Sequence, residues 1–189
     1  MLGSYLAINT TFFIISASYL ILVLLYCFVL KHLIIVDVLV ISIGFVIRAV
    51  AGALAISVFI SPWLIVCTFL LALVLALGKR RGELAILGDE AEAHRVSLSE
   101  YSTEMLDQMI SITTGASIVS YLMYTFFVDN YYMMLTAPSV VYGLFRYLFL
   151  VHQKDVGAEP EKMFKDKPTL INLAVWALLS ALVLYKIPF

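Results

Sequence analysis

Residues 78–84, GKRRGEL, bring three cations and one carboxylate together directly after the apolar run 71–77. Lys79 and Glu83 are four residues apart, so on a helix they would share a face and could pair. The two glycines of the stretch would weaken a helix and leave backbone amides available as donors. Charge-assisted donors gathered in this way suit a diphosphate or a phosphorylated sugar. The alternative interpretation is a cationic anchor at the lipid headgroups, and composition does not separate the two.

Arg48 is a second candidate because it lies about fifteen residues into an apolar segment, ~22 Å along a helix axis. An arginine at membrane depth costs at least ~2.5 kcal/mol unless it meets water or a partner. Asp37 stands eleven residues earlier. It points the same way but lies ~16 Å away, too far to pair. Arg48 therefore either lines a wet cavity that receives a charged ligand or caps the carbonyls of a broken helix.

Other polar side chains mark the ends of the apolar segments. Lys31 by itself would most often extend to the headgroups, and Tyr26 would belong to the interfacial aromatic belt. Arg146 lies near the end of the fifth segment and shares a helical face with Tyr142. The sequence contains no HExxH motif and no Cys/His cluster, so the protein side chains alone do not predict a metal site.

The elements that carry these residues are those of a membrane protein. Hydrophobic residues make up 63% of the 189-residue chain and charged residues 13%, with a mean hydropathy of +1.02. A soluble domain carries roughly 25% charged residues, and long apolar runs favour helices over a barrel. The net charge of −1 indicates no charged partner, and we expect no nucleic-acid binding. Cys27 and Cys67 lie in apolar runs, where we expect packing rather than a disulfide.

Six apolar segments predict an all-α polytopic membrane helix bundle, a single domain over residues 1–189, since each span needs ~20 residues. The loops after the first, third and fifth segments hold most of the Lys and Arg residues, and the loops after the second and fourth hold none. The basic loops are therefore predicted to be cytoplasmic, with both termini on the opposite side. The approximate limits of the segments are residues 10–30, 33–59, 62–77, 106–128, 131–151 and 169–187.

The connection over residues 78–105 is longer than a simple turn, and we expect it to form a small helical cap at the cytoplasmic face. Ser97 and Glu100 have capping-box spacing, which predicts a helix that starts near Leu98 and runs into the fourth span. A further short helix is predicted after Pro160.

A series of motifs gives the chain a specific resemblance. In order they are YCFVLKH (26–32), VDV (36–38), GFVIRAVAGA (44–53), SPW (61–63) and GKRRGEL (78–84), then Arg146–Tyr147, Glu159–Pro160, DKP (166–168) and Asn172. From about residue 10 to its end, the chain resembles the decaprenyl-phosphate phosphoribosyltransferase branch of the UbiA prenyltransferase superfamily. The series is far more restrictive than any one of its motifs.

The resemblance implies a fold that extends beyond this sequence. Members of the family have nine membrane helices, and the six segments here match the fourth to the ninth. The family's Asp-rich NDxxDxxxD motif, which carries Mg²⁺, follows the second helix and does not occur in this sequence. The resemblance thus implies Mg²⁺ as cofactor, with ligands mostly outside this chain, and an activity that is incomplete without a missing N-terminal segment.

The activity that the resemblance implies is transfer of 5-phosphoribosyl from phosphoribosyl pyrophosphate to a polyprenyl phosphate, with release of diphosphate. It places the enzyme in the cell (inner) membrane, with a cytoplasmic active face and a role in cell wall biosynthesis. Cleavage at the anomeric carbon develops positive charge on the ribose and negative charge on the diphosphate, which cations stabilise. The lipid phosphate is already an anion, so it needs positioning more than deprotonation.

The matching positions carry roles over from the family as expectations. Asp37 and Glu83 are the implied catalytic residues, with Asp37 as an acceptor for a ribose hydroxyl or a metal-bound water. The implied ligands of the phosphoribosyl donor are Lys79, Arg80, Arg81 and Glu83. The implied ligands of the lipid phosphate are Tyr26, Lys31, Arg48 and Arg146.

Two other functions remain open at this point. A UbiA-type aromatic prenyltransferase would use a prenyl diphosphate, but such enzymes usually carry a second Asp-rich motif where GKRRGEL stands. A non-catalytic membrane bundle or an inactive fragment is the other alternative. Against a transporter-like bundle, the sequence shows no inverted repeat and no pair of broken helices placed alike in two halves.

Overall fold

A computed structural model describes residues 2–87, 98, 100–128, 130–153 and 156–186, and this part of the chain is helical without strands. Six α-helices carry the fold, joined by short 3₁₀ turns. The α-helices are α1 (Leu2–Phe28), α2 (Val36–Ala55), α3 (Pro62–Leu87), α6 (Thr103–Phe127), α7 (Ala137–Gln153) and α8 (Lys167–Lys186). The 3₁₀ turns are η1 (Leu30–His32), η3 (Tyr131–Thr136), η4 (Val156–Ala158) and η5 (Pro160–Lys165).

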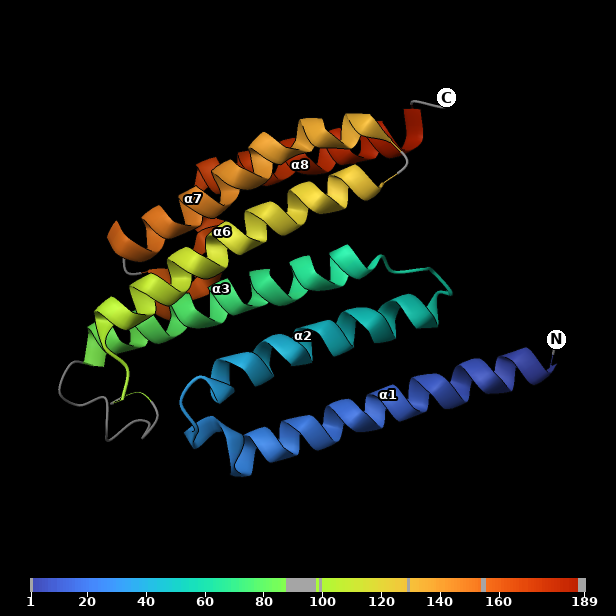
Figure 1. Cartoon of the computed structure of the whole chain (residues 1–189), viewed down its shortest axis with the longest axis horizontal. Helices are drawn as coiled ribbons and strands as arrows, with labels where there is room; N and C mark the ends of the chain where they lie inside the picture. Colours follow the sequence, from blue (N-terminus) through green and yellow to red (C-terminus); the bar gives the residue numbers. More distant parts are fainter. Residues whose placement is uncertain (1, 88–97, 99, 129, 154–155, 187–189) are drawn as a thin grey trace.

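The helices run lengthwise through an elongated bundle, in which α1, α2, α3 and α6 follow one another side by side (Figure 1). Helix α3 packs against both α2 and α6, and α7 packs against α8. The C-terminal ends of α1, α3 and α7 lie at one end, and the start of α1 and the end of α8 lie at the other (Figure 1). We call the first of these the basic end, because η1, the last turns of α3, the turn η5 and the start of α8 bring seven of the twelve Lys and Arg residues there.

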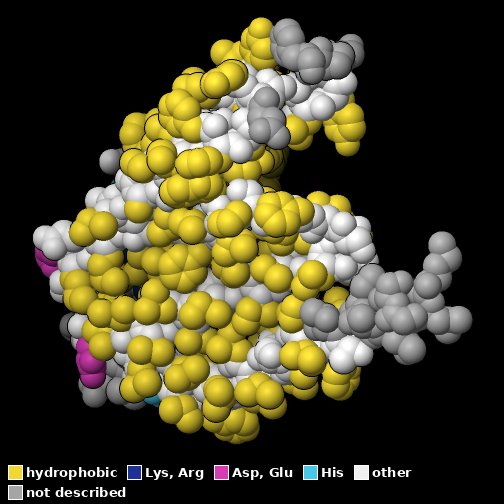
Figure 2. Space-filling view, turned by 45° about the vertical axis from the view of Figure 1, so that its right-hand side comes forward, with side chains coloured by type: hydrophobic (Ala, Val, Ile, Leu, Met, Phe, Trp, Pro, Cys, Tyr) yellow, Lys and Arg dark blue, Asp and Glu magenta, His cyan; other side chains and the backbone are white. Residues whose placement is uncertain are grey.

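The predicted helical membrane bundle is confirmed. Five helices among the described residues, α2, α3, α6, the η3–α7 stretch and α8, are long and apolar enough to cross a membrane. Helix α1 contributes a shorter apolar stretch, Phe12–Phe28. Figure 2 shows a face made almost wholly of hydrophobic side chains, with the acidic side chains in view confined to one edge. A surface of this kind is stable in lipid rather than in water.

The boundaries of the helices differ from the expected spans. Helix α2 is shorter than the predicted 33–59 and ends after Ala55. There the Val58 amide donates to the Ala53 carbonyl at 2.9 Å and Ser57 takes a positive φ of 57°. This is a Schellman termination, with serine at the left-handed position that glycine usually occupies.

Helix α3 is longer than predicted, because it continues without a break through GKRRGEL to Leu87. The expectation that Gly78 and Gly82 weaken the helix here is therefore wrong. A Cβ on Gly82 would lie 2.0 Å from the Ala158 backbone nitrogen, and one on Gly78 would lie 2.2 Å from the Tyr147 hydroxyl oxygen. The two glycines form a notch in α3 that receives η4 and the α7 side chain, and this close approach is the packing reason for them.

The start of α6 also differs from the prediction. Ser97 lies outside the described residues, Glu100 is in a turn, and α6 begins only at Thr103. Ser102 is the N-cap, and its hydroxyl accepts from the Met105 amide at 3.1 Å. A helix running on from Leu98 is therefore wrong, and the cap over residues 78–105 stays a prediction. The short helix after Pro160 is confirmed as η5.

Candidate functional site

Arg80 of α3 forms the centre of an ionic cluster at the basic end. It is 3% exposed, and its Nε donates to Asp37 Oδ2 at 2.8 Å. Its Nη1 donates to Glu83 in a short ion pair, and its Nη2 donates to the Tyr26 hydroxyl at 3.5 Å. All three guanidinium nitrogens are therefore engaged by side chains that come from α1, α2 and α3. We call Asp37, Arg80 and Glu83 the charged triad.

Local sequence explains how these three side chains meet. Asp37 lies in the first turn of α2, where the positive end of the helix dipole favours a carboxylate. Arg80 and Glu83 are three residues apart on α3, on neighbouring positions of one helical face. Helices α2 and α3 pack against each other, which closes the triad between them. The buried cluster of Val38, Ala76, Leu77, Tyr101, Leu106 and Ile110 surrounds this junction.

The charges of the triad do not balance, because two carboxylates share one guanidinium. Asp37 is fully buried, whereas the Glu83 side chain is 26% exposed. Removing one partner from a buried ion pair is costly, so Arg80 is held where it is. Arg80 is thus less available to a diphosphate than the sequence indicated, and the member of the triad that a ligand can reach is Glu83.

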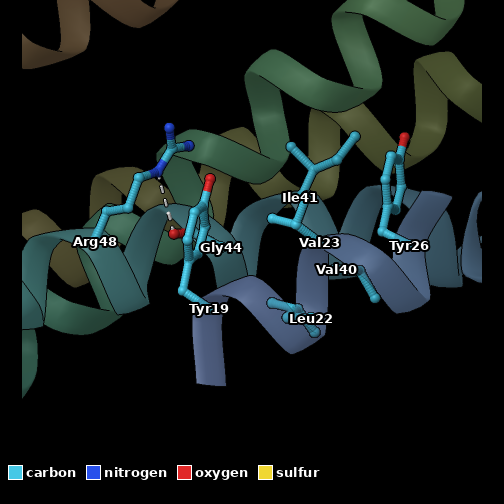
Figure 3. Close-up of a pocket in the computed structure, with 8 residues that line it drawn as sticks. All are labelled: Tyr19, Leu22, Val23, Tyr26, Val40, Ile41, Gly44 and Arg48. Carbon is cyan, nitrogen blue, oxygen red and sulfur yellow. Dashed lines mark hydrogen bonds between the residues drawn. The ribbon is translucent and has the colours of Figure 1, made fainter. Parts of the chain in front are cut away.

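Arg48 borders a cavity of about 160 Å³ between α1 and α2. Its Nε donates to the Gly44 carbonyl at 3.3 Å, and its guanidinium carbon lies 4.2 Å from the centre of the Phe45 ring. Figure 3 shows the guanidinium and the hydroxyls of Tyr19 and Tyr26 pointing to the same side of the α1–α2 pair. Helix α2 is unbroken here, so the cap on a broken helix is wrong, although one nitrogen of Arg48 bonds a carbonyl of the intact helix. That this cavity receives a charged ligand stays a prediction.

Tyr26 connects this cavity to the charged triad. It lines the cavity with Tyr19 and Arg48, and its hydroxyl accepts from Arg80 Nη2. Arg48 and Tyr26 thus lie at the two ends of one cavity (Figure 3), whose remaining lining is mainly the apolar Leu22, Val23, Val40 and Ile41, and Arg48 itself is exposed. Asp37 bonds to Arg80 rather than to Arg48. This agrees with the prediction that Asp37 and Arg48, eleven residues apart on α2, are too distant to pair.

The two lysines of the predicted site lie at the same end. Lys31 is in η1 and half-buried, and Lys79 is exposed on α3. The predicted pairing of Lys79 with Glu83 is replaced in the structure by the ion pair of Glu83 with Arg80. An exposed ammonium group next to the triad can meet an anionic ligand without leaving a buried partner.

Arg81 points away from the triad, although it is the neighbour of Arg80 in sequence. Its Nε donates to Asp107 Oδ1 at 2.6 Å and its Nη1 to the Val151 carbonyl at 3.3 Å. His152 lies at the end of α7 with its Nε2 3.1 Å from the same Asp107 oxygen. Arg81 thus joins α3 to α6 and α7.

Arg146 is also engaged by a carboxylate. Its Nε and Nη2 donate to the two oxygens of Asp166 at 2.9 and 2.7 Å, a bidentate pair. Asp166 in turn accepts from the amide and the hydroxyl of Thr169 in the first turn of α8. The hydrogen bonds from Arg146 lower the pKa of Asp166 well below its ordinary value. The aspartate of the DKP motif therefore caps the start of α8 and is bound by Arg146 of α7.

Sequence reasoning missed two tyrosines of this region. Tyr19 stands seven residues before Tyr26, two helical turns away on the same face, so its spacing carried a usable signal. Tyr101 donates from its hydroxyl to Asp37 Oδ1 at 3.1 Å. It is 64 residues from Asp37 in sequence, and no local pattern could have indicated that contact.

The described residues do not by themselves make the magnesium site that the resemblance implies. No group of three or more His, Cys, Asp or Glu side chains that could hold a metal ion occurs among them. The nearest pair of carboxylates, Asp37 and Glu83, is shared by Arg80, which competes with a metal ion for the same oxygens.

Comparison with known proteins gives a consistent group of relatives. The model of the UbiA prenyltransferase family matches residues 1–173. A decaprenyl-phosphate phosphoribosyltransferase of Mycolicibacterium smegmatis is 28% identical over 176 residues, which cover 86% of this chain and 55% of the relative. The enzyme of the same name from Corynebacterium glutamicum is 27% identical over 177 residues, covering 90% and 53%. That of Mycobacterium tuberculosis H37Rv is 27% identical over 166 residues, covering 86% and 55%. The chain spans about half the length of these relatives.

Proposed function

Because the chain belongs to the UbiA prenyltransferase family, we propose that it serves the transfer of 5-phosphoribosyl from phosphoribosyl pyrophosphate to a polyprenyl phosphate. The observation that carries this proposal is the continuity of the charged triad with the Arg48 cavity through Tyr26. An ionic cluster and a mainly apolar cavity with one arginine, which share Tyr26, suit a reaction between a charged donor and a lipid phosphate. The names of the relatives include a lipid of this class, decaprenyl phosphate.

The reaction breaks the bond between the anomeric carbon of ribose and the diphosphate oxygen, whose electron pair leaves with diphosphate. A lipid phosphate oxygen forms the new bond to that carbon, and no proton has to be removed from it at neutral pH. Glu83, the reachable carboxylate of the triad, faces the positive charge that develops on the ribose. This interaction is stronger in the transition state than in the bound substrate, so we assign Glu83 to catalysis.

The cations divide between the two substrates. Lys79, at the basic end, lies where it can attract the donor's diphosphate from water, and Lys31 at the same end stays assigned to the lipid phosphate. Arg48, with the hydroxyls of Tyr19 and Tyr26, lines the cavity within the bundle and receives the lipid phosphate, whose tail remains in the bilayer. Arg80 and Asp37 are buried and orient Glu83. The active face is then the basic end, on the cytoplasmic side of the cell membrane.

The proposed activity extends to a segment that the relatives have and this chain does not span. The relatives are longer by nearly half of their length. Helix α1 packs against α2 and exposes large apolar side chains, among them Phe13 and Phe28, on which further helices can pack. We propose that such a segment contributes the metal-binding carboxylates, since those described here are shared by Arg80.

The test is an assay with purified chain in nanodiscs, alone and together with the segment of the M. smegmatis relative that the chain does not cover. Phosphoribosyl pyrophosphate labelled in the ribose, Mg²⁺ and decaprenyl phosphate are supplied, and the label in the lipid extract is measured. We expect labelled lipid at least in the presence of the segment. No labelled lipid in either sample, with prenylation of an aromatic acceptor by a prenyl diphosphate, would assign the chain to another branch of the family.

A further inference from the structure

Tyr101 lies beneath the charged triad, in the turn that precedes α6. It is 4% exposed, and its ring packs in the buried cluster with Val38 and Leu106. Its hydroxyl makes two hydrogen bonds to α2 and the residue before it. The Ile35 amide donates to the hydroxyl oxygen at 2.7 Å, and the hydroxyl lies 3.1 Å from Asp37 Oδ1.

The chemistry of the three groups fixes the direction of both hydrogen bonds. The Ile35 amide can only donate, so the Tyr101 oxygen accepts from it. An ionised Asp37 carboxylate can only accept, so the single hydroxyl proton of Tyr101 goes to Asp37. Burial raises the pKa of Tyr101 to about 12, so the phenol keeps this proton at neutral pH.

The backbone at Ile35 is strained, and this gives the first hydrogen bond its importance. Ile35 has φ 65° and ψ −45°, and the Val36 amide donates to the Ile34 carbonyl at 2.7 Å. These values describe a γ-turn of the rare positive-φ type, which a β-branched residue adopts only at a cost. The Ile35 amide precedes α2 and has no acceptor within the helix, so Tyr101 supplies one from another part of the chain.

We propose that Tyr101 is a positioning residue of this site, because its hydroxyl holds the strained turn and Asp37 together and thereby sets Arg80 and Glu83. The hydroxyl acts through two ion pairs, because Asp37 binds Arg80 and Arg80 binds Glu83. The proposal deepens the proposed function and rests on it for the role of Glu83. A tyrosine that served packing alone would contribute its ring and not its hydroxyl.

The test compares Tyr101→Phe with Tyr147→Phe in the full chain in detergent. Both tyrosines are buried, but the Tyr147 hydroxyl has no hydrogen-bond partner among the described residues, which makes it the matched control. Hydrogen–deuterium exchange is measured on the peptide over residues 30–38. We expect exchange to become roughly tenfold faster in Tyr101→Phe, the scale of one lost hydrogen bond, and to stay unchanged in Tyr147→Phe. Equal exchange in both variants would overturn the proposal.

A second readout separates positioning from packing. In the transfer assay, normalised to folded protein, we expect Tyr101→Phe to lower kcat roughly tenfold and to change both KM values by less than about twofold. An unchanged kcat, even with a lower Tm, would make Tyr101 structural and overturn the proposal. If the wild type transfers no label, the proposed function has failed, whereas the exchange experiment still decides whether Tyr101 holds the turn.

A third variant guards against misfolding of Tyr101→Phe. Ile35 is 38% exposed, and glycine adopts a positive φ at little cost, so Ile35→Gly relieves the strain with a small loss of packing. We expect Ile35→Gly to restore folding to Tyr101→Phe if the single variant fails to fold. Failure of the double variant to fold would contradict a role of Tyr101 in holding this turn.

Discussion

Arg80 and Arg146 lie near the same end of the bundle, and both bind carboxylates, yet the two sites are built differently. Arg80 is bonded by side chains of three helices and shares its charge between two carboxylates, one of them fully buried. Arg146 makes both of its ion-pair contacts to the one carboxylate of Asp166, which also caps α8. Among the described residues, the first places two carboxylates on one guanidinium, and the second pairs one carboxylate with one guanidinium between α7 and α8.

Both residues are arginines, so residue type does not distinguish them. The number of carboxylates that each one binds does, and it separates the candidate functional site from a structural ion pair. A one-to-one pair that also caps a helix is satisfied, and a lipid phosphate could bind Arg146 only by displacing Asp166. The charged triad instead leaves Glu83 partly exposed, and its Arg80 contacts Tyr26, which lines the Arg48 cavity. The assignment of Arg146 to the lipid phosphate stays a prediction, with an evident competitor for its guanidinium.

The largest expected effect is that of Arg80→Met. It removes the guanidinium that pairs with the buried Asp37, which costs about 3–5 kcal/mol for a buried pair, and we expect turnover to fall by at least roughly tenfold. Arg146→Met should lower the free energy of unfolding less, because its pair is more exposed. Unfolding in mixed micelles measures both variants. Asp37→Asn should recover part of the loss in Arg80→Met, and equal losses for both arginines would remove the contrast between them.

Gly78 and Gly82 allow α3 to pack closely against α7 and η4, and Gly82→Ala should disrupt the contact with η4. The added Cβ would meet the backbone of Gly157 and Ala158, so we expect a loss of about 1–3 kcal/mol in the free energy of unfolding. Gly115 of α6 is the matched control, because a Cβ there meets nothing within 4 Å. Gly115→Ala should be neutral or stabilise by up to about 1 kcal/mol. The same micelle unfolding assay applies, and a neutral Gly82→Ala would show that η4 does not seat as described.

Glu83→Gln tests whether the negative charge of Glu83 contributes to the reaction. The amide keeps a hydrogen bond to Arg80 but removes the negative charge that faces the ribose, so we expect kcat to fall roughly tenfold or more with little loss of stability. Asp166→Asn is the control on the other site, and its kcat should stay within about twofold of the wild type. Turnover with labelled donor measures both. Near-normal turnover in Glu83→Gln would favour the alternative interpretation, in which GKRRGEL is a cationic anchor at the lipid headgroups.

The smallest expected effect is the pH dependence of the α7–α8 joint. The folded-state pKa of Asp166 is lowered by Arg146, so the contribution of the pair is present above the ordinary aspartate pKa. It is lost as the pH falls below about 4 and through the lower folded value. The difference in Tm between wild type and Arg146→Met should therefore be constant from about pH 5 to 8 and shrink in acid. A Tm difference that grows as the pH falls would contradict the predicted direction of this pH dependence.

Much of the architecture could be predicted because it depends on local composition. Apolar runs set the spans and the loop cations mark one end of the bundle, and both follow from the chemistry of lipid and water along the chain. The site could be predicted only as a set of cations. That Arg80 is saturated, that Arg81 turns to Asp107 and that Arg146 holds Asp166 depend on contacts between residues 20 to 43 positions apart. Spacing within one segment does not contain this information.

The sequence by itself determined a helical membrane protein of the UbiA family with its charges gathered at one end, because hydrophobicity and motifs are properties of neighbouring residues. Only the tertiary structure decided which carboxylate each arginine meets, that the glycines of α3 receive η4, and that the Tyr101 hydroxyl reaches Asp37. The physical reason is that ion pairs and hydrogen bonds require distances of about 3 Å. Helix packing, and not the order of residues, sets such distances between segments.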